Sequence, residues 1–154
     1  LVDENGTGKK EAEFYQSQWK DKLGIDVDVE VLTKKERIAR AKAGDFEIVR
    51  YAWGPDYADP MTYLEIFHSK AKDINFAKYS NPEYDELIDL AKVNQDNKTR
   101  MDAMKKAEKL LANNFTYSTL YYEVGVYLIN PKLKGVVIRS VGDSIDFYNA
   151  SITK

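Results

Sequence analysis

The 154-residue sequence contains no cysteine and a single histidine, His68. Without cysteine the chain has no disulfide and no thiolate metal ligand, and one histidine cannot supply the several nitrogen ligands of a zinc or copper centre. We therefore expect no metal and no cofactor. The absence of cysteine assigns no compartment, because such a chain suits either redox environment.

Basic residues are not in excess, and long apolar runs are missing. The 23 Lys and Arg residues stand against 25 Asp and Glu residues, for a net charge of −2. A general nucleic-acid-binding protein needs a strong positive field to attract phosphates, so we expect no nucleic-acid partner. No stretch approaches the ~18 apolar residues of a membrane span. The 44% hydrophobic and 31% charged residues are ordinary for one globular domain.

The chain also lacks an initiator methionine and a signal peptide. Residues 1–8, LVDENGTG, are typical of the end of a strand followed by a turn. A chain that opens within a structural element is expected to be a piece of a longer one.

Hydrophobic periodicity predicts alternating strands and helices in the first half. Residues 9–23 space their apolar side chains as a helix does, and residues 25–32 alternate apolar and acidic side chains like a strand with one covered face. Thr33 and Glu36 have the T-x-x-E spacing of a capping box, which predicts another helix. Residues 46–53 are more continuously apolar, as in a buried parallel strand. This order predicts a βαβ unit with parallel strands and a right-handed crossover.

Three helix starts are predicted in the second half. Asp59 before Pro60 suits the N-cap and first position of a short helix to about residue 67. Ser80 and Glu83 offer another capping pattern, for a helix over the residues that follow. A further amphipathic helix is predicted over residues 97–112.

The last quarter of the chain predicts short strands. Residues 117–129, YSTLYYEVGVYLI, are expected to form one bent strand or two short strands around Gly125. Strands are also predicted over residues 136–139 and 145–152. The chain as a whole is predicted to be α/β, with a mixed sheet flanked by helices.

The stretch VRYAWGPDYADP, residues 49–60, carries two aspartates close together in a turn. They could form a metal site, a catalytic acid pair, a helix start or a grip on a cationic ligand. Ligands of open α/β sheets bind in loops beyond the carboxyl ends of parallel strands, and this is such a loop. Asp59 is expected to be occupied in capping a helix. Asp56 has no such role and, beside Trp53, suits a cationic group; an Asx-turn is the alternative.

Arg50 is unusual because strand alternation places it with Phe46, Ile48 and Ala52. A guanidinium in such surroundings either pairs with a buried carboxylate or reaches the edge of the ligand, where its planar fork suits a carboxylate.

A small hydrolase with Asp56 and Asp59 as an acid pair and His68 assisting is the alternative from another functional class. His68, however, lies at a predicted helix end, where a cation favours the helix dipole. Because Asp59 is expected to cap a helix, we expect no enzyme activity.

Three stretches resemble a known family: GDFEIVRYAWGPDYADPMTYLEIF, YSNPEYDELID and STLYYEVGVYLINPKLKGV. They are similar to the C-terminal part of bacterial oligopeptide-binding proteins of solute-binding protein family 5, the extracytoplasmic subunits of peptide ABC importers. The resemblance covers essentially all of the chain, in the same order and with similar gaps.

The resemblance implies the C-terminal lobe of a type 2 periplasmic-binding-protein-like fold. Residues 1–140 are expected to form the second ligand-binding lobe, and residues 141–154 a tail that returns toward a missing N-terminal lobe. It further implies a monomer that works with membrane permease subunits, as a cell-surface lipoprotein or in the periplasm.

The resemblance also implies a peptide ligand. In the family, the aspartate at the position of Asp56 binds the peptide's α-amino group, the preceding strand pairs with the peptide backbone, and the strand arginine lies near a carboxylate in some short-peptide complexes. The ligand-binding residues implied here are Asp56, Trp53, Arg50, Tyr51, Ala52, Gly54, Tyr122 and Glu123. A second carboxylate-binding arginine of the best-known members is replaced by Ala41, with Arg40 adjacent. Other members carry heme, nickel chelates, sugars or signalling peptides, which are the nearest alternatives.

Overall fold

The computed structural model describes residues 1–142 and 144–153 of the chain, which divide into two compact units. Unit 1 consists of Leu1–Ala52 and Phe67–Ser80, and unit 2 of Trp53–Ile66 and Asn81–Lys154. No helix in the described part of the chain is long and apolar enough to cross a membrane.

A short parallel pair of strands lies at the start of unit 1. β1 (Val2–Asp3) pairs with β2 (Val31–Leu32), and α1 (Gly8–Leu23) connects them. The predicted opening strand and turn and the first helix are thus confirmed. The strand predicted over residues 25–32 is too long, because only its last two residues pair with a neighbour.

The strand predicted over residues 46–53 does not form a regular ladder. The N-terminal amino group of Leu1 donates to the carbonyl of Ile48 at 2.6 Å, and the Arg50 N–H donates to the carbonyl of Leu1 at 3.0 Å. These two bonds have the pattern of a parallel pair. Both bonds are made by Leu1, the residue directly before β1. β1 therefore lies between this segment and β2. The two segments that were predicted to be the strands of a βαβ unit are separated by β1.

The helix after β2 begins at the predicted capping box. α2 (Lys34–Ala43) starts where the Thr33 hydroxyl accepts from the Glu36 N–H and the Glu36 carboxylate accepts from the Thr33 N–H. It ends at Gly44, whose φ of 76° is left-handed and favours glycine.

The segment after residue 67 contains several buried side chains, although its sequence is mostly polar. The Asn75 side chain donates to the carbonyl of Tyr79 and accepts from the Tyr79 N–H. Phe76, the next residue in the sequence, is also buried. His68 is 4% exposed, and its Nδ1 accepts from the Lys70 N–H at 3.0 Å. His68 is thus a buried side chain directly after the short helical segment that ends at residue 67.

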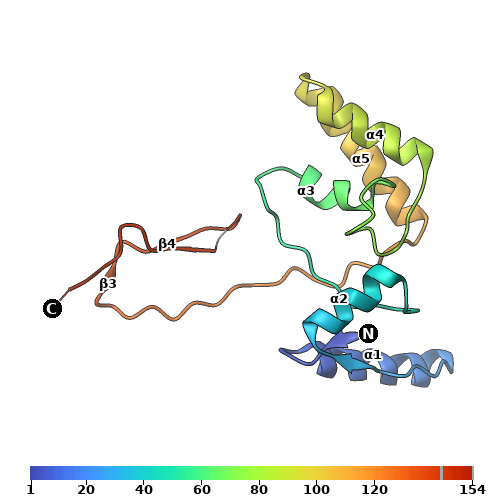
Figure 1. Cartoon of the computed structure of the whole chain (residues 1–154), viewed down its shortest axis with the longest axis horizontal. Coiled ribbons are helices and arrows are strands. Elements are labelled where there is room, and N and C mark those ends of the chain that lie inside the picture. The colour runs from blue at the N-terminus through green and yellow to red at the C-terminus, as the bar shows by residue number, and fades with distance from the viewer. Residues whose placement is uncertain (143, 154) are drawn as a thin grey trace. The chain divides into compact units, whose positions relative to one another are not determined.

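Unit 2 is built on a helical pair. α4 (Pro82–Val93) and α5 (Asn97–Asn113) lie side by side (Figure 1). Their predicted apolar stripes are buried, with Tyr84, Ile88, Ala91, Met104, Ala107 and Leu111 at most 2% exposed. The start of α4 differs from the prediction, because the Asn81 side chain, not that of Ser80, accepts from the first N–H groups.

α3 (Met61–Leu64) and the 3-10 turn η1 (Glu65–Phe67) precede this pair. They confirm the short helix predicted to run to about residue 67. The Tyr84 hydroxyl donates to the carbonyl of Leu64 at 2.6 Å and so joins α4 to α3.

Two antiparallel pairs of strands complete unit 2. β3 (Leu133–Lys134) pairs with β6 (Ser151–Ile152), and β4 (Val137–Ile138) pairs with β5 (Ile145–Asp146). The strand predicted over residues 136–139 is present in shortened form as β4. The single strand predicted over residues 145–152 is instead divided into β5 and β6, which pair with different strands.

The strands predicted over residues 117–129 are absent from the structure. Among the described residues this segment pairs with no strand, and Tyr122, Val124, Val126 and Leu128 are each at least 84% exposed. The prediction is wrong because an apolar sequence becomes a strand only where another strand supplies hydrogen-bond partners.

Candidate functional site

The predicted ligand-binding residues belong to both units. Arg50, Tyr51 and Ala52 lie in unit 1, whereas Trp53, Gly54, Asp56, Tyr122 and Glu123 lie in unit 2.

Arg50 pairs with a carboxylate inside unit 1. Its Nε donates to Oε2 of Glu11 at 2.7 Å, and the two side chains are only 21% and 20% exposed. The main chain is held too, because the Arg50 carbonyl accepts from Nη1 of Arg37 at 3.1 Å. Of the two roles that the sequence allows for this guanidinium, the structure shows the pairing with a carboxylate.

Arg37 is a neighbour of these residues that sequence reasoning missed. It is 5% exposed, and its Nε donates to Oδ1 of Asp3 at 2.8 Å. Its guanidinium carbon lies 5.1 Å from the ring centroid of Tyr51, a cation–π distance. The available signal was its place four residues before the buried Ala41 on one face of α2, because a charge on a buried helix face needs partners.

The ring of Tyr51 contacts two neighbouring side chains. The ring meets that of Phe76 edge to face, with 4.9 Å between centroids and 88° between planes, in addition to the contact with Arg37. Ala52 follows as an exposed residue, and its main chain has no hydrogen-bond partner among residues 1–142 and 144–153.

The loop that carries Asp56 is fixed within unit 2. The Asp56 N–H donates to Oγ1 of the buried Thr62 at 3.2 Å, and the Tyr57 hydroxyl donates to Glu65. The carbonyl of Pro55 accepts from the Gly142 N–H at 3.2 Å. Three successive residues are therefore anchored, which fixes the main chain from which the Asp56 side chain projects.

The Asp56 carboxylate itself is exposed. Within the part of the chain that the structure describes, no group pairs with it. Trp53, three residues earlier, is half-buried, and a Cβ placed on Gly54 would meet nothing within 4 Å, so the space beside that main chain is open. The arrangement can receive a cationic group at Asp56.

Asp59 is already occupied, as the sequence predicts. Its Oδ1 accepts from the Met61 N–H at 2.9 Å at the start of α3 and from Nη2 of Arg100 at 2.7 Å. The Arg100 hydrogen bond is the main cause that lowers the pKa of Asp59 below its usual value. The acid of a catalytic pair needs a raised pKa, so Asp59 is unsuited to that role.

Metal chemistry finds no support in the geometry either. Within residues 1–142 and 144–153, no group of three or more His, Asp or Glu side chains is placed to hold a metal ion.

Tyr122 and Glu123 lie on the extended segment between α5 and β3. Tyr122 is 92% exposed, and Glu123 is also exposed.

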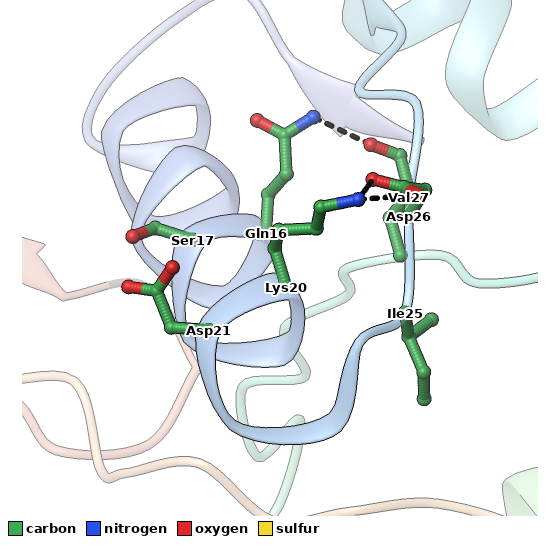
Figure 2. Close-up of a pocket in the computed structure, with 7 residues that line it drawn as sticks. All are labelled: Gln16, Ser17, Lys20, Asp21, Ile25, Asp26 and Val27. Carbon is green, nitrogen blue, oxygen red and sulfur yellow. Dashed lines mark hydrogen bonds and ion pairs between the residues drawn. The ribbon is translucent and has the colours of Figure 1, made fainter.

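A shallow polar depression of about 310 Å³ lies in unit 1, between α1 and residues 25–27 (Figure 2). Lys20 pairs with Asp26 across it at 2.5 Å, and Gln16 donates to the carbonyl of Val27. None of the predicted ligand-binding residues lines it. The side chains around it tie the end of α1 to the segment that leads to β2.

Comparisons with known proteins show which family the chain is similar to. Residues 1–75 match the model of the middle region of bacterial extracellular solute-binding proteins, family 5. The dipeptide-binding protein DppE of Bacillus subtilis is 37% identical over 134 residues, covering 87% of this chain and 24% of DppE.

Solved structures show the same fold. The substrate-binding domain of an oligopeptide ABC transporter from Bacillus anthracis superposes with a TM-score of 0.87 at 30% identity, covering 99% of this chain and 31% of that protein. The Haemophilus influenzae OppA complex with RPPGFSPFR has a TM-score of 0.84 at 31% identity, over 95% and 29% of the two chains. The fold is thus that of a lobe of a periplasmic peptide-binding protein.

The chain belongs to the bacterial extracellular solute-binding proteins of family 5. It spans about a quarter of the length of the curated relatives that it matches. These relatives are named for peptide binding and transport, not for catalysis.

Proposed function

We propose that this chain is a peptide-binding lobe of the solute-binding receptor of a bacterial ABC peptide importer. The observation that carries the proposal is the contrast between two neighbouring aspartates: Asp59 is occupied by Arg100 and the start of α3, whereas Asp56 is exposed on an anchored loop with no partner among the described residues. Asp56 binds the α-amino group of a peptide.

The main chain of residues 51–54 supplies the rest of the peptide contact. Backbone pairing gives affinity without reading the peptide's sequence, because every peptide offers the same N–H and carbonyl groups. The main-chain N–H and carbonyl groups of Ala52 and Gly54 form no hydrogen bond with any described residue. Tyr122 and Glu123 are the further peptide contacts in this proposal.

The anchoring of the loop that carries Asp56 favours peptide binding, because it lowers the entropic cost of binding. A main chain that is already held in place loses little freedom when a ligand arrives, so the remaining ordering cost is that of the Asp56 side chain. Exclusion of water then strengthens its attraction to the ammonium group. A ligand without the ammonium group leaves the carboxylate enclosed and unpaired, which is costly.

The complete receptor is, in this proposal, a longer protein with a second lobe. The exposed apolar side chains of residues 117–129 support it, because contiguous exposed apolar surface marks contact with further protein. Residues 1–140 form the second lobe and residues 141–154 a tail toward the first. The receptor is a monomer outside the cytoplasm, free in the periplasm or anchored as a cell-surface lipoprotein, delivers peptides to the permease subunits and catalyses no reaction.

The test compares free-amino and N-acetylated forms of one peptide with the complete receptor, by isothermal titration calorimetry. Asp56→Asn should weaken binding of the free-amino peptide about 10- to 100-fold, because a charge-assisted hydrogen bond contributes about 1.5–3 kcal/mol. The same variant should not weaken the already weak binding of the acetylated peptide, because it removes the enclosed carboxylate that such a peptide leaves unpaired.

Asp102→Asn is the matched control. It removes a carboxylate from an exposed pair with Lys98 on α5 and should leave both affinities unchanged. Equal losses for the free-amino and acetylated peptides in Asp56→Asn would contradict the assignment of Asp56. Failure of the unaltered receptor to bind either peptide would contradict the proposed function as a whole.

A further inference from the structure

The ion pair between Arg50 and Glu11 is held from several directions. The Glu11 carboxylate accepts from Nε of Arg50 through one oxygen and from the Thr7 hydroxyl through the other. Glu11 also lies in the first turn of α1, where the positive end of the helix dipole favours a carboxylate. The Glu11 carboxylate is therefore held in place beside the Arg50 guanidinium.

A second ion pair lies beside this one. Arg37 contacts the Arg50 carbonyl and pairs with Asp3, so each of these two arginines has a carboxylate partner in unit 1. Arg40, the other arginine that sequence reasoning noted, is likewise engaged with Glu30 and Asp45. A further carboxylate arriving at Arg50 meets a pair that is already neutral, and it is repelled by Glu11 at close range.

We infer that Glu11 is a specificity-determining residue, which neutralises Arg50 so that the receptor does not select peptides by a carboxylate at their C-terminus. The inference rests on the proposed function, because it concerns the segment next to the proposed peptide contacts at residues 51–54. The ligands it favours are peptides recognised by their amino end, including peptides whose C-terminus is blocked or continues further.

The experiment uses the complete receptor and alanine peptides of three and five residues, each with a free amino group and prepared as the C-terminal acid and the C-terminal amide. The readout is the ratio of the amide Kd to the acid Kd, from calorimetry. We expect the unaltered receptor to show a ratio within about twofold of one at both lengths. Glu11→Gln removes the carboxylate that pairs with Arg50 and should raise the ratio to about fivefold or more for at least one length.

Three further variants separate a specificity role from a structural one. Glu11→Asp keeps the carboxylate and should keep the ratio near one. Glu13→Gln, on the same helix but in an exposed pair with Lys9, should do the same. The double variant Glu11→Gln with Arg50→Gln removes both charges and should return the ratio to one, because no arginine then reads the acid.

Two results would overturn the inference while peptide binding itself persists. One is an unaltered receptor that prefers the acid by about fivefold or more. The other is a ratio in Glu11→Gln that equals that of the unaltered receptor. If Glu11→Gln does not fold, Arg50→Gln decides. It removes the charge opposite the Glu11 carboxylate, which should then repel a ligand carboxylate and lower the ratio about fivefold below one, whereas an unchanged ratio would overturn the inference. Absence of binding by all four peptides would instead reject the proposed function.

Discussion

Asp59 and Arg100 are 41 residues apart in the sequence and are joined by a hydrogen bond of 2.7 Å between carboxylate and guanidinium. This bond fixes the start of α3 to α5 and withdraws one of two neighbouring aspartates from any ligand. Asp56 is left as the carboxylate of the loop without a partner among the described residues.

The Asp59–Arg100 pair predicts a pH dependence. Because the pKa of Asp59 is lower in the folded protein than its usual 3.8, its stabilisation is present above about pH 4 and is lost as the pH falls through the folded pKa. Asp59→Asn should lower the free energy of unfolding of the complete receptor at pH 7 by about 1 to 2 kcal/mol. The difference from the unaltered receptor should shrink below about pH 4.

Denaturant unfolding followed by circular dichroism at a series of pH values measures this difference. Asp102→Asn, in its exposed pair with Lys98, should change the free energy of unfolding by less than about 0.5 kcal/mol at every pH. A loss in Asp59→Asn that stays constant down to pH 2 would show that the charge of Asp59 is not what stabilises the fold.

We expect the Tyr84 hydroxyl to stabilise the fold in addition to the packing of the Tyr84 ring. Tyr84→Phe keeps the buried ring but leaves the carbonyl of Leu64 without its donor, so the free energy of unfolding should fall by about 1 to 2 kcal/mol. Tyr63→Phe, at a 44% exposed tyrosine of the neighbouring helix, is the control and should be nearly neutral. Equal effects of both substitutions in thermal unfolding would contradict this role of the hydroxyl.

The cap of α4 distinguishes two adjacent polar residues. Asn81→Ala removes the acceptor for the N–H groups of Glu83 and Tyr84 and should cost about 1 kcal/mol, with faster hydrogen exchange in the first turn. Ser80→Ala, one residue earlier, should leave the exchange rates unchanged. Faster exchange in Ser80→Ala and not in Asn81→Ala would restore the capping pattern that the sequence suggested.

The helices were predictable because their signals are local. The capping box of Thr33 and Glu36 acts within one turn, and Gly44 ends α2 through its own backbone conformation. The buried stripe of Tyr84, Ile88 and Ala91 follows from the helical period alone. The role of Asp59 was also local, since it lies two residues before the N–H that it accepts from.

The strands and the ion pairs were not predictable in this way. Residues 117–129 have a strand-like sequence, but whether they form a strand depends on a neighbour elsewhere in the chain. Sequence alone left two roles open for Arg50 because Glu11, its partner, lies 39 residues earlier.

The sequence by itself determined which segments form helices, that Asp59 starts a helix, and which family the chain resembles. Each of these depends on residues within a turn or two of each other, or on a pattern carried along the whole chain. Only the tertiary structure decided that Arg50 is neutralised by Glu11, that Arg37 is buried against Tyr51, and that Asp59 is paired with Arg100. The attraction between two charges depends on the distance between them in space, and only folding sets that distance.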